Sequence, residues 1–470
     1  MSTSRVAAAG LGLAAVFAVP LAAIGAEPAA ELQQLKNQID ELRQLHESRL
    51  QALERRILEL QAQPPADPAQ PNSPLAPPAG PAAAPASASA FNPAISLILA
   101  GTHARLSRDP ANYRLHGFIP SGSEAGPGRR GFQIGESELG IGANIDPLFS
   151  GRLTASLAGD DGVSVEEAWF ERQGLFDGGT LRGGRFLSSI GYLNDHHAHT
   201  WDFVDAPLAY QAFFGGPIKT DGLQLRWLAP TQRYFELGAE IGSGASFPGS
   251  DTGRNGIGST ALFAHVGDDL GDNASWRAGA SVVHHRASDR GFDDRNAAGT
   301  PVTNAFSGSS RTWALDGIYK WAPGGNARRQ SLVIQGEYLR RTEAGSLSHD
   351  TQSLAGGPAS GDYRATQAGG YLQAVYQFMP RWRIGARYDR LDSGTPNIGL
   401  LGTGGLTAAD FPVLLSARPS RSSLMVDYSP SEFSRLRLQF GADRSNPAAT
   451  DRQIFLQYIM SLGAHGAHRF

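Results

Sequence analysis

The sequence contains no cysteine, so disulfide bridges, thiolate zinc sites and cysteine nucleophiles are excluded. It has no excess of positive charge: 41 Lys and Arg residues stand against 44 Asp and Glu residues, which argues against a nucleic-acid-binding protein. Apolar runs long enough to span a membrane as a helix are absent after residue 24, and the mean hydropathy is −0.26. What remains is a chain of low charge with 57 glycines among 470 residues.

The N-terminus has the layout of a secretory signal. Arg5 supplies a positive charge, residues 6–24 are apolar, and the small residues Ala23, Gly25 and Ala26 follow. We therefore predict a signal peptide over residues 1–26, with an uncleaved membrane anchor as the alternative.

Residues 27–63 carry a heptad pattern. The apolar positions, interrupted once by a stutter near His46, are Leu32, Leu35, Ile39, Leu42, Leu50, Leu53, Ile57 and Leu60. The pattern predicts a self-associating coiled coil, and a helix packed on the main domain is the alternative. Residues 64–90 hold nine prolines among Ala, Ser and Gln, which is typical of an extended linker.

Residues 91–470 read as strands. Stretches of about ten residues alternate apolar and polar side chains and are separated by Gly, Pro, Asn, Asp and Ser, most clearly over 381–389 and 435–442. The polar face carries Gly, Ser, Gln and Arg, and aromatic residues recur near strand ends. These features favour an all-β fold, a transmembrane antiparallel β-barrel, preceded by the short coiled-coil helix.

We count about sixteen strands, an even number as expected for a single-chain outer-membrane barrel. Short turns alternate with long inserts, which we place at 187–220, 286–309 and 392–419. A barrel of this size leaves an aqueous lumen. The last residue, Phe470, falls on the apolar face of the last strand, where it resembles the assembly signal of bacterial outer-membrane barrels.

The stretch from Gly184 to Gly191, Gly-Arg-Phe-Leu-Ser-Ser-Ile-Gly, is similar to a stretch of the phosphate-selective porin O/P family. The order of signal peptide, coiled coil, Pro/Ala linker, barrel and terminal Phe resembles the same family. The resemblance implies a trimeric porin with a periplasmic coiled coil and an anion-selective pore lined by Arg and Lys. It does not extend to the lysine cluster on which phosphate selectivity rests, because the chain has only Lys36, Lys219 and Lys320.

The polar faces of the predicted strands supply candidate pore-lining residues. The acidic and basic rows fall on strands that lie on roughly opposite walls of a closed barrel, which predicts a transverse field across the pore; a lumen whose charges only keep it wet is the alternative. The candidates are Arg226, Arg277, Arg381, Arg383, Arg387, Arg435, Arg437, Glu236 and Glu240, with further acids at Glu167, Glu171 and Glu337.

The insert 187–220 holds a His-rich loop over 194–202. Its His196, His197 and His199, with two aspartates nearby, could bind a divalent metal such as zinc, because imidazole and carboxylate suit that ion. The alternative is a polar loop folded into the lumen. No Gly-x-Ser-x-Gly motif or similar catalytic pattern stands out, so we expect neither an enzyme nor a cofactor.

The sequence thus predicts a porin of the Gram-negative outer membrane for passive diffusion of small hydrophilic solutes, with an anion preference implied by the resemblance. The domains are 1–26, 27–63, 64–90 and the barrel 91–470. Expected partners are outer-membrane lipid, the barrel-assembly machinery, the solutes and two further copies of the chain, with no nucleic acid. A metal-uptake or metal-binding protein and an envelope tether acting through the coiled coil are the alternatives.

Overall fold

The computed structural model describes residues 93–463, except 123–124, 158–161 and 251–254. The predicted signal peptide, coiled coil and linker, and the terminal Phe470, lie outside the described residues. Among the described residues, no helix is both long and apolar enough to cross a membrane.

The described chain is built almost entirely of strands, with one short α-helix, α2 (Leu208–Phe214). Single turns of 3₁₀-helix occur at Pro110–Asn112, Ala198–Thr200, Pro323–Gly325, Ala408–Asp410 and Pro412–Leu414. The strands are β1 (Ala94–Leu106), β2 (Gly131–Ile134), β3 (Ser137–Asn144), β4 (Phe149–Leu157), β5 (Val163–Gln173), β6 (Gly179–Leu187), β7 (Lys219–Leu228), β8 (Tyr234–Gly242), β9 (Ser259–Leu270), β10 (Ala274–Arg295), β11 (Pro301–Trp321), β12 (Ser331–His349), β13 (Ala359–Met379), β14 (Trp382–Asp392), β15 (Asn397–Ile398), β16 (Ser420–Ser431), β17 (Ser434–Asn446) and β18 (Ala449–Gly463).

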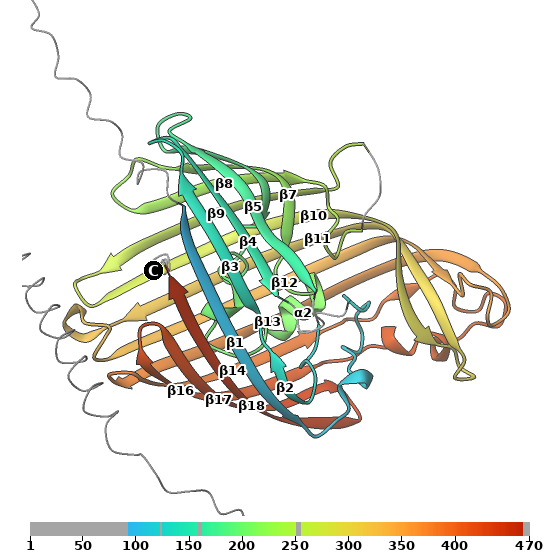
Figure 1. Cartoon of the computed structure of the whole chain (residues 1–470). Helices are drawn as coiled ribbons and strands as arrows, with labels where there is room; N and C mark the ends of the chain where they lie inside the picture. Colours follow the sequence, from blue (N-terminus) through green and yellow to red (C-terminus); the bar gives the residue numbers. More distant parts are fainter. Residues whose placement is uncertain (1–92, 123–124, 158–161, 251–254, 464–470) are drawn as a thin grey trace, which may run out of the picture. The chain divides into compact units, whose positions relative to one another are not determined.

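The strands close into one antiparallel barrel (Figure 1). The last strand pairs with the first, from Ser96 opposite Gly463 to Leu106 opposite Gln453, so the sheet has no free edge there. Short β2 and β15 are additions to this ring, since β1 also pairs with β3 and β14 with β16. Sixteen strands therefore form the wall, which confirms the predicted number.

The two ends of the barrel differ in their connections. Tight links such as Met379 to Trp382 and Ser431 to Ser434 join strands at the end where the described chain begins and ends, which we call the short-turn end. Long connections, including 107–130, 188–218 and 393–419, lie at the opposite end. This asymmetry is the one found in outer-membrane barrels.

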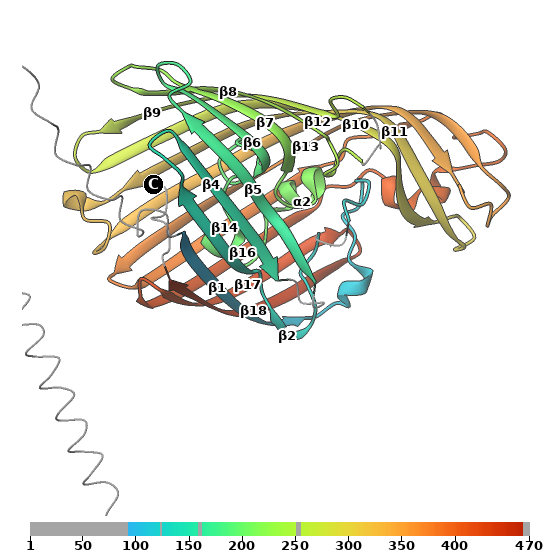
Figure 2. The same cartoon turned by 45° about the horizontal axis from the view of Figure 1, so that its top comes forward.

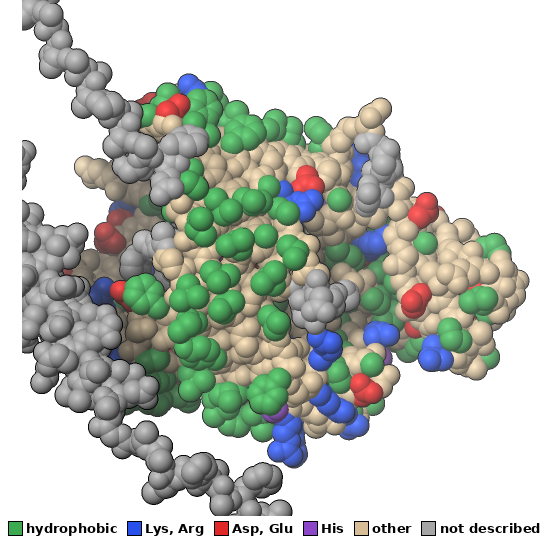
Figure 3. Space-filling model, viewed as in Figure 1, with side chains coloured by type: hydrophobic (Ala, Val, Ile, Leu, Met, Phe, Trp, Pro, Cys, Tyr) green, Lys and Arg blue, Asp and Glu red, His purple; other side chains and the backbone are tan. Residues whose placement is uncertain are grey.

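Polar side chains point inward and apolar ones outward. On β17, Leu436 and Leu438 are 42% and 38% exposed, whereas Arg437 and Gln439 between and beside them are 1% and 0% exposed. On β7, Leu223 and Leu225 are exposed and Gln224 is buried. Figure 3 shows hydrophobic side chains spread over the outer face of the strands, with charged side chains mostly toward the strand ends. This inside-out pattern is that of a barrel that crosses a membrane.

Four strands project beyond the rest at the end of the barrel opposite the short-turn end (Figure 1). β10, β11, β12 and β13 have 22, 21, 19 and 21 residues. The expectation of a long insert at 286–309 was therefore wrong: most of it is an extension of the β10–β11 hairpin past a bulge between Ala287 and Arg290. The extensions enclose an apolar cluster of their own, which includes Phe306, Leu347, Tyr363 and Phe411 and supplies the burial that this hairpin needs.

Candidate functional site

The connection between β6 and β7, residues 188–218, runs into the barrel; we call it the inserted segment (Figure 2). It carries α2, in which every residue is buried. Helix α2 ends at Gly215, whose φ of 73° is a left-handed conformation that glycine adopts without strain. Phe213 and Tyr210 pack in one apolar cluster with the wall residues Leu339, Tyr371 and Leu391.

Carboxylates of the wall accept hydrogen bonds from the backbone of the inserted segment. Glu240 accepts from Ser189 N–H at 2.9 Å and from Ser188 Oγ at 2.6 Å. Glu337 accepts from Leu193 N–H and from Tyr210 Oη, both at 2.9 Å. These acids satisfy buried N–H groups that regular secondary structure leaves free.

Wall residues also fix the start of α2. The N–H of Leu208, the first residue of the helix, donates to Asp389 Oδ1 of β14 at 2.9 Å. Gly191 lies against Glu337 and Tyr210, and a side chain there would collide with the Glu337 carboxylate at 2.3 Å. The inserted segment is thus fitted closely to the wall.

On the opposite side of the barrel, arginines hold Asp202 and Asp205, two of the three aspartates of the inserted segment. Arg383 binds Asp202 at 2.9 Å and also Asp427 of β16. Asp205 binds two buried arginines, Arg387 at 2.8 Å and Arg421 at 2.6 Å. Burial would raise the pKa of Asp205, but the charges of Arg421 and Arg387 outweigh it and keep that pKa below its usual value.

Two arginines of β17 hold the backbone of the same stretch. Arg437 donates to the carbonyl of Trp201 at 2.6 Å, and Arg435 donates to the carbonyls of Trp201 and His199. The structure places Arg383 and Arg387 of β14 and Arg435 and Arg437 of β17 inside the barrel, where they clamp residues 199–205.

The other predicted pore residues lie as follows. Arg226 pairs with Glu171 at 2.8 Å, Glu236 contacts His265 at 3.1 Å, and Arg277 donates to the carbonyl of Gly191 at 3.3 Å. Arg381 does not extend the row of Arg383 and Arg387, because it occupies the β13–β14 turn with a φ of 73° and is exposed.

A cavity of about 1070 Å³ lies between the inserted segment and the short-turn end. Ser431, Phe433 and Ser434 border it on one side, and Asp195, Trp201 and Asp202 on the other. Its acidic and basic lining residues are equal in number: Glu138, Glu167, Asp195, Asp202, Asp205 and Glu432 against Arg152, Arg182, Lys320, Arg383, Arg387 and Arg435.

The three histidines of the predicted metal loop do not meet at one point. His196 pairs with Asp195 at 2.8 Å and stacks on Tyr192. His197 and His199 stack with their ring centroids 5.7 Å apart, and both contact Glu138.

His197 is surrounded by carboxylates. Burial would lower the pKa of its ring, but hydrogen bonds to Glu138, Glu166 and Glu167 outweigh it and raise that pKa well above its usual value.

The sequence alone did not identify three residues of this site: Glu138, Glu166 and Arg421, which binds Asp205. The adjacent pair Glu166 and Glu167 inside a strand was the available signal, since one of the two should face lipid unless the strand is irregular.

The closed wall, the apolar outer surface and the polar interior define a transmembrane antiparallel β-barrel of sixteen strands, with a segment folded into its lumen. The chain belongs to one family with an uncharacterized protein of Aquifex aeolicus (strain VF5), to which it is 30% identical over 413 residues, covering 82% of this chain and 81% of that protein. No model of a known protein family matches the chain.

Several solved structures of outer-membrane proteins are similar at low identity. They include a loop-deletion mutant of OmpT from Vibrio cholerae (12% identity, 79% of this chain and 100% of that chain, TM-score 0.49). An anion-selective porin from Comamonas acidovorans has 12% identity over 79% of this chain and 100% of that chain, with a TM-score of 0.48. The channel DcaP of Acinetobacter baumannii has 11% identity over 80% of this chain and 99% of that chain, with a TM-score of 0.46.

Proposed function

We propose that this protein is a channel of the Gram-negative outer membrane through which small hydrophilic solutes diffuse passively, and not an enzyme. The observation that carries the proposal is the cavity of about 1070 Å³ inside a membrane-crossing barrel, lined by ionised side chains. Such side chains inside a barrel keep the lumen hydrated. The inserted segment narrows the lumen and sets the size of solute that passes.

The balance of charge around the cavity bears on the choice of solute. Six carboxylates face six Lys and Arg side chains, and the arginines that the resemblance would assign to anions are bound to Asp202, Asp205 or backbone carbonyls. We therefore propose that any anion preference is weak and that the porin O/P resemblance does not extend to phosphate. The acidic wall of β3 and β5 and the basic wall of β14 and β17 support a transverse field that orients dipolar solutes.

The N-terminal segment completes the proposal. A coiled coil over 27–63 would hold three barrels together from the periplasm, and the linker 64–90 would let each barrel stay in the membrane. Deleting 27–90 separates this role from a tether: single barrels should still conduct, whereas a tether would lose its only function.

The chain has no cysteine, so a single introduced thiol reports on one position. We expect Ser461→Cys, which borders the cavity, to react with a water-soluble thiol reagent and to lose conductance as the reagent obstructs the lumen. The neighbouring Leu462→Cys is the matched control, because Leu462 is 43% exposed on the lipid face. Planar-bilayer recording before and after the reagent makes the comparison. An unchanged current in modified Ser461→Cys would exclude a pathway through this cavity.

A further inference from the structure

An irregularity in β5 turns two neighbouring carboxylates into the lumen. In the β4–β5 ladder Thr154 is opposite Glu167 and Ala155 is opposite Val165, so Glu166 is an extra residue in the strand. Adjacent residues of a regular strand face opposite sides, and a bulge of this kind re-aims one of them. Glu166 and Glu167 are accordingly both buried, at 5% and 7% exposure.

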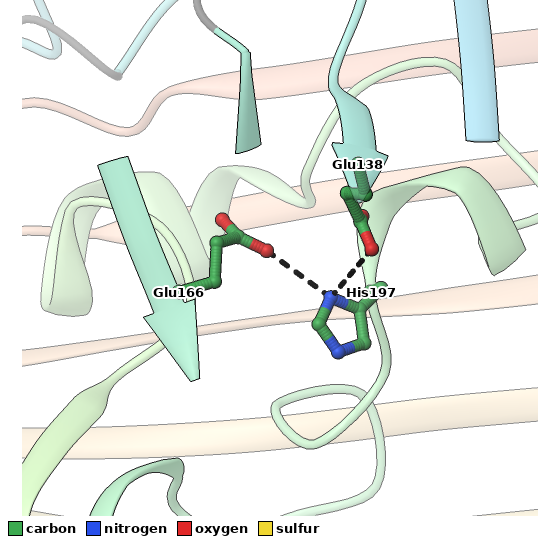
Figure 4. A group of neighbouring side chains, drawn as sticks. All are labelled: Glu138, Glu166 and His197. Carbon is green, nitrogen blue, oxygen red and sulfur yellow. Dashed lines mark hydrogen bonds and ion pairs between the residues drawn. The ribbon is translucent and has the colours of Figure 1, made fainter. Parts of the chain in front are cut away.

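Glu166 and Glu138 of β3 meet one imidazole of the inserted segment, His197 (Figure 4), and Glu167 contacts the other nitrogen of the same ring. His197 Nδ1 lies 3.1 Å from Glu166 Oε2 and 3.2 Å from Glu138 Oε2, and its Nε2 lies 3.0 Å from Glu167 Oε2. One nitrogen thus faces two carboxylates at once, and a single N–H on it would be shared between them. The three ligand atoms lie within 4.8 Å of one another.

We propose that Glu138, Glu166 and His197 bind a divalent cation of the zinc type. Zinc accepts imidazole nitrogen and carboxylate oxygen as ligands, and three such protein ligands leave a fourth position for water. Glu138 and His197 border the cavity, so water and the ion reach the site from there. The ion takes the place of the proton on Nδ1, and the negative charges of both carboxylates then face the positive charge of the ion.

Glu167 completes the arrangement as a positioning residue. Its carboxylate at Nε2 accepts the remaining ring N–H of His197, which leaves the Nδ1 lone pair directed at Glu138 and Glu166. Histidine ligands of metals commonly donate their second nitrogen to a carboxylate in this way. Trp169 Nε1 donates to the other oxygen of Glu167 at 3.1 Å and fixes it in turn.

The site joins three elements, since Glu138 belongs to β3, Glu166 to β5 and His197 to the inserted segment. A bound ion would therefore tie the inserted segment to the acidic wall, just as the arginines tie it to the basic wall. This inference does not depend on conduction, because binding is measured on the purified barrel whether or not it forms a pore.

Isothermal titration of zinc chloride into the metal-free, full-length protein in detergent tests the proposal. We expect one zinc ion per chain with micromolar or tighter affinity. His197→Ala and the isosteric Glu166→Gln should each abolish this binding step, and Glu167→Gln should weaken it about 10- to 100-fold. His196→Ala is the matched control, because this adjacent histidine pairs with Asp195 outside the cluster, and its binding should equal that of the wild type.

The absorption of cobalt(II) in the same protein gives a second readout, since the intense visible bands of a four-coordinate site should appear in the wild type and vanish in Glu166→Gln. Heat-modified migration on gels shows that each variant is folded. The proposal is overturned if the folded wild type binds no zinc, or if His197→Ala and Glu166→Gln bind it as the wild type does.

Discussion

Removing the inserted segment should widen the pore and admit solutes that the wild type excludes. Leu187 and Lys219 are opposite each other in the β6–β7 ladder, so a two-residue Asn-Gly turn can replace residues 188–218 without moving either strand. The groups left on the wall are largely charged or polar, among them Glu240, Glu337 and Arg437, and water can solvate them once the segment is gone. A sixteen-stranded barrel without a plug is a wide aqueous channel.

Swelling of proteoliposomes in a series of sugars of increasing size measures this change. The deletion variant should let in oligosaccharides that do not enter wild-type vesicles, and its rate for small sugars should rise severalfold. Shortening the exposed turn 402–405 in the loop before β16 is the control, and it should leave the size limit unchanged. An equal size limit in the deletion variant and the wild type would show that the segment does not restrict the lumen.

Asp205→Asn should destabilise the barrel strongly. Asp205 is the shared partner of Arg387 and Arg421, whose side chains are 2% and 1% exposed, and its other contact is Gln439 at 2.9 Å. The amide removes the negative charge. It leaves Arg387 with Asp389 at 3.0 Å, and Arg421 with Asp389 at 3.7 Å and Asp443 at 3.8 Å. Removing one member of a buried ion pair costs roughly 3–5 kcal/mol, and these two carboxylates should keep the loss near the lower end.

Urea unfolding in lipid vesicles measures the free energy of unfolding of the wild type and of Asp205→Asn. Asp392→Asn is the matched control: Asp392 binds Arg418 at 3.2 Å, but the two side chains are 45% and 69% exposed. Such an exposed pair contributes at most about 1 kcal/mol. Equal losses in the two variants would mean that the clamp on the inserted segment does not depend on the Asp205 charge.

The wall of the barrel was predictable from the sequence because its signal is local. Alternation with a period of two places lipid-facing and lumen-facing residues strand by strand, and the predicted stretch 435–442 lies within β17 (Ser434–Asn446). The lengths of β10 to β13 were not predictable, because residues 286–309 are rich in Gly, Ser and Asp. They form strands only where Phe306 and Leu347 pack against distant residues such as Phe411.

The site was predictable only in part, because many of its contacts join residues that are distant in the sequence. The inward rows of Arg383, Arg387, Arg435 and Arg437 follow from alternation. Their partners in the inserted segment lie about 180 to 236 residues away and leave no local pattern. The His-rich loop was recognisable as a candidate, yet the acids that meet His197 come from β3 and β5. The bulge at Glu166 depends on strand pairing, which a single sequence does not state.

Single-channel recording of the purified full-length protein in planar lipid bilayers tests the central claim most directly. We predict discrete current steps that grow with salt concentration, and a step size well below that of the variant lacking residues 188–218, because the inserted segment narrows a water-filled lumen. Folded barrels that insert into the bilayer and give no steps in either form would contradict the account.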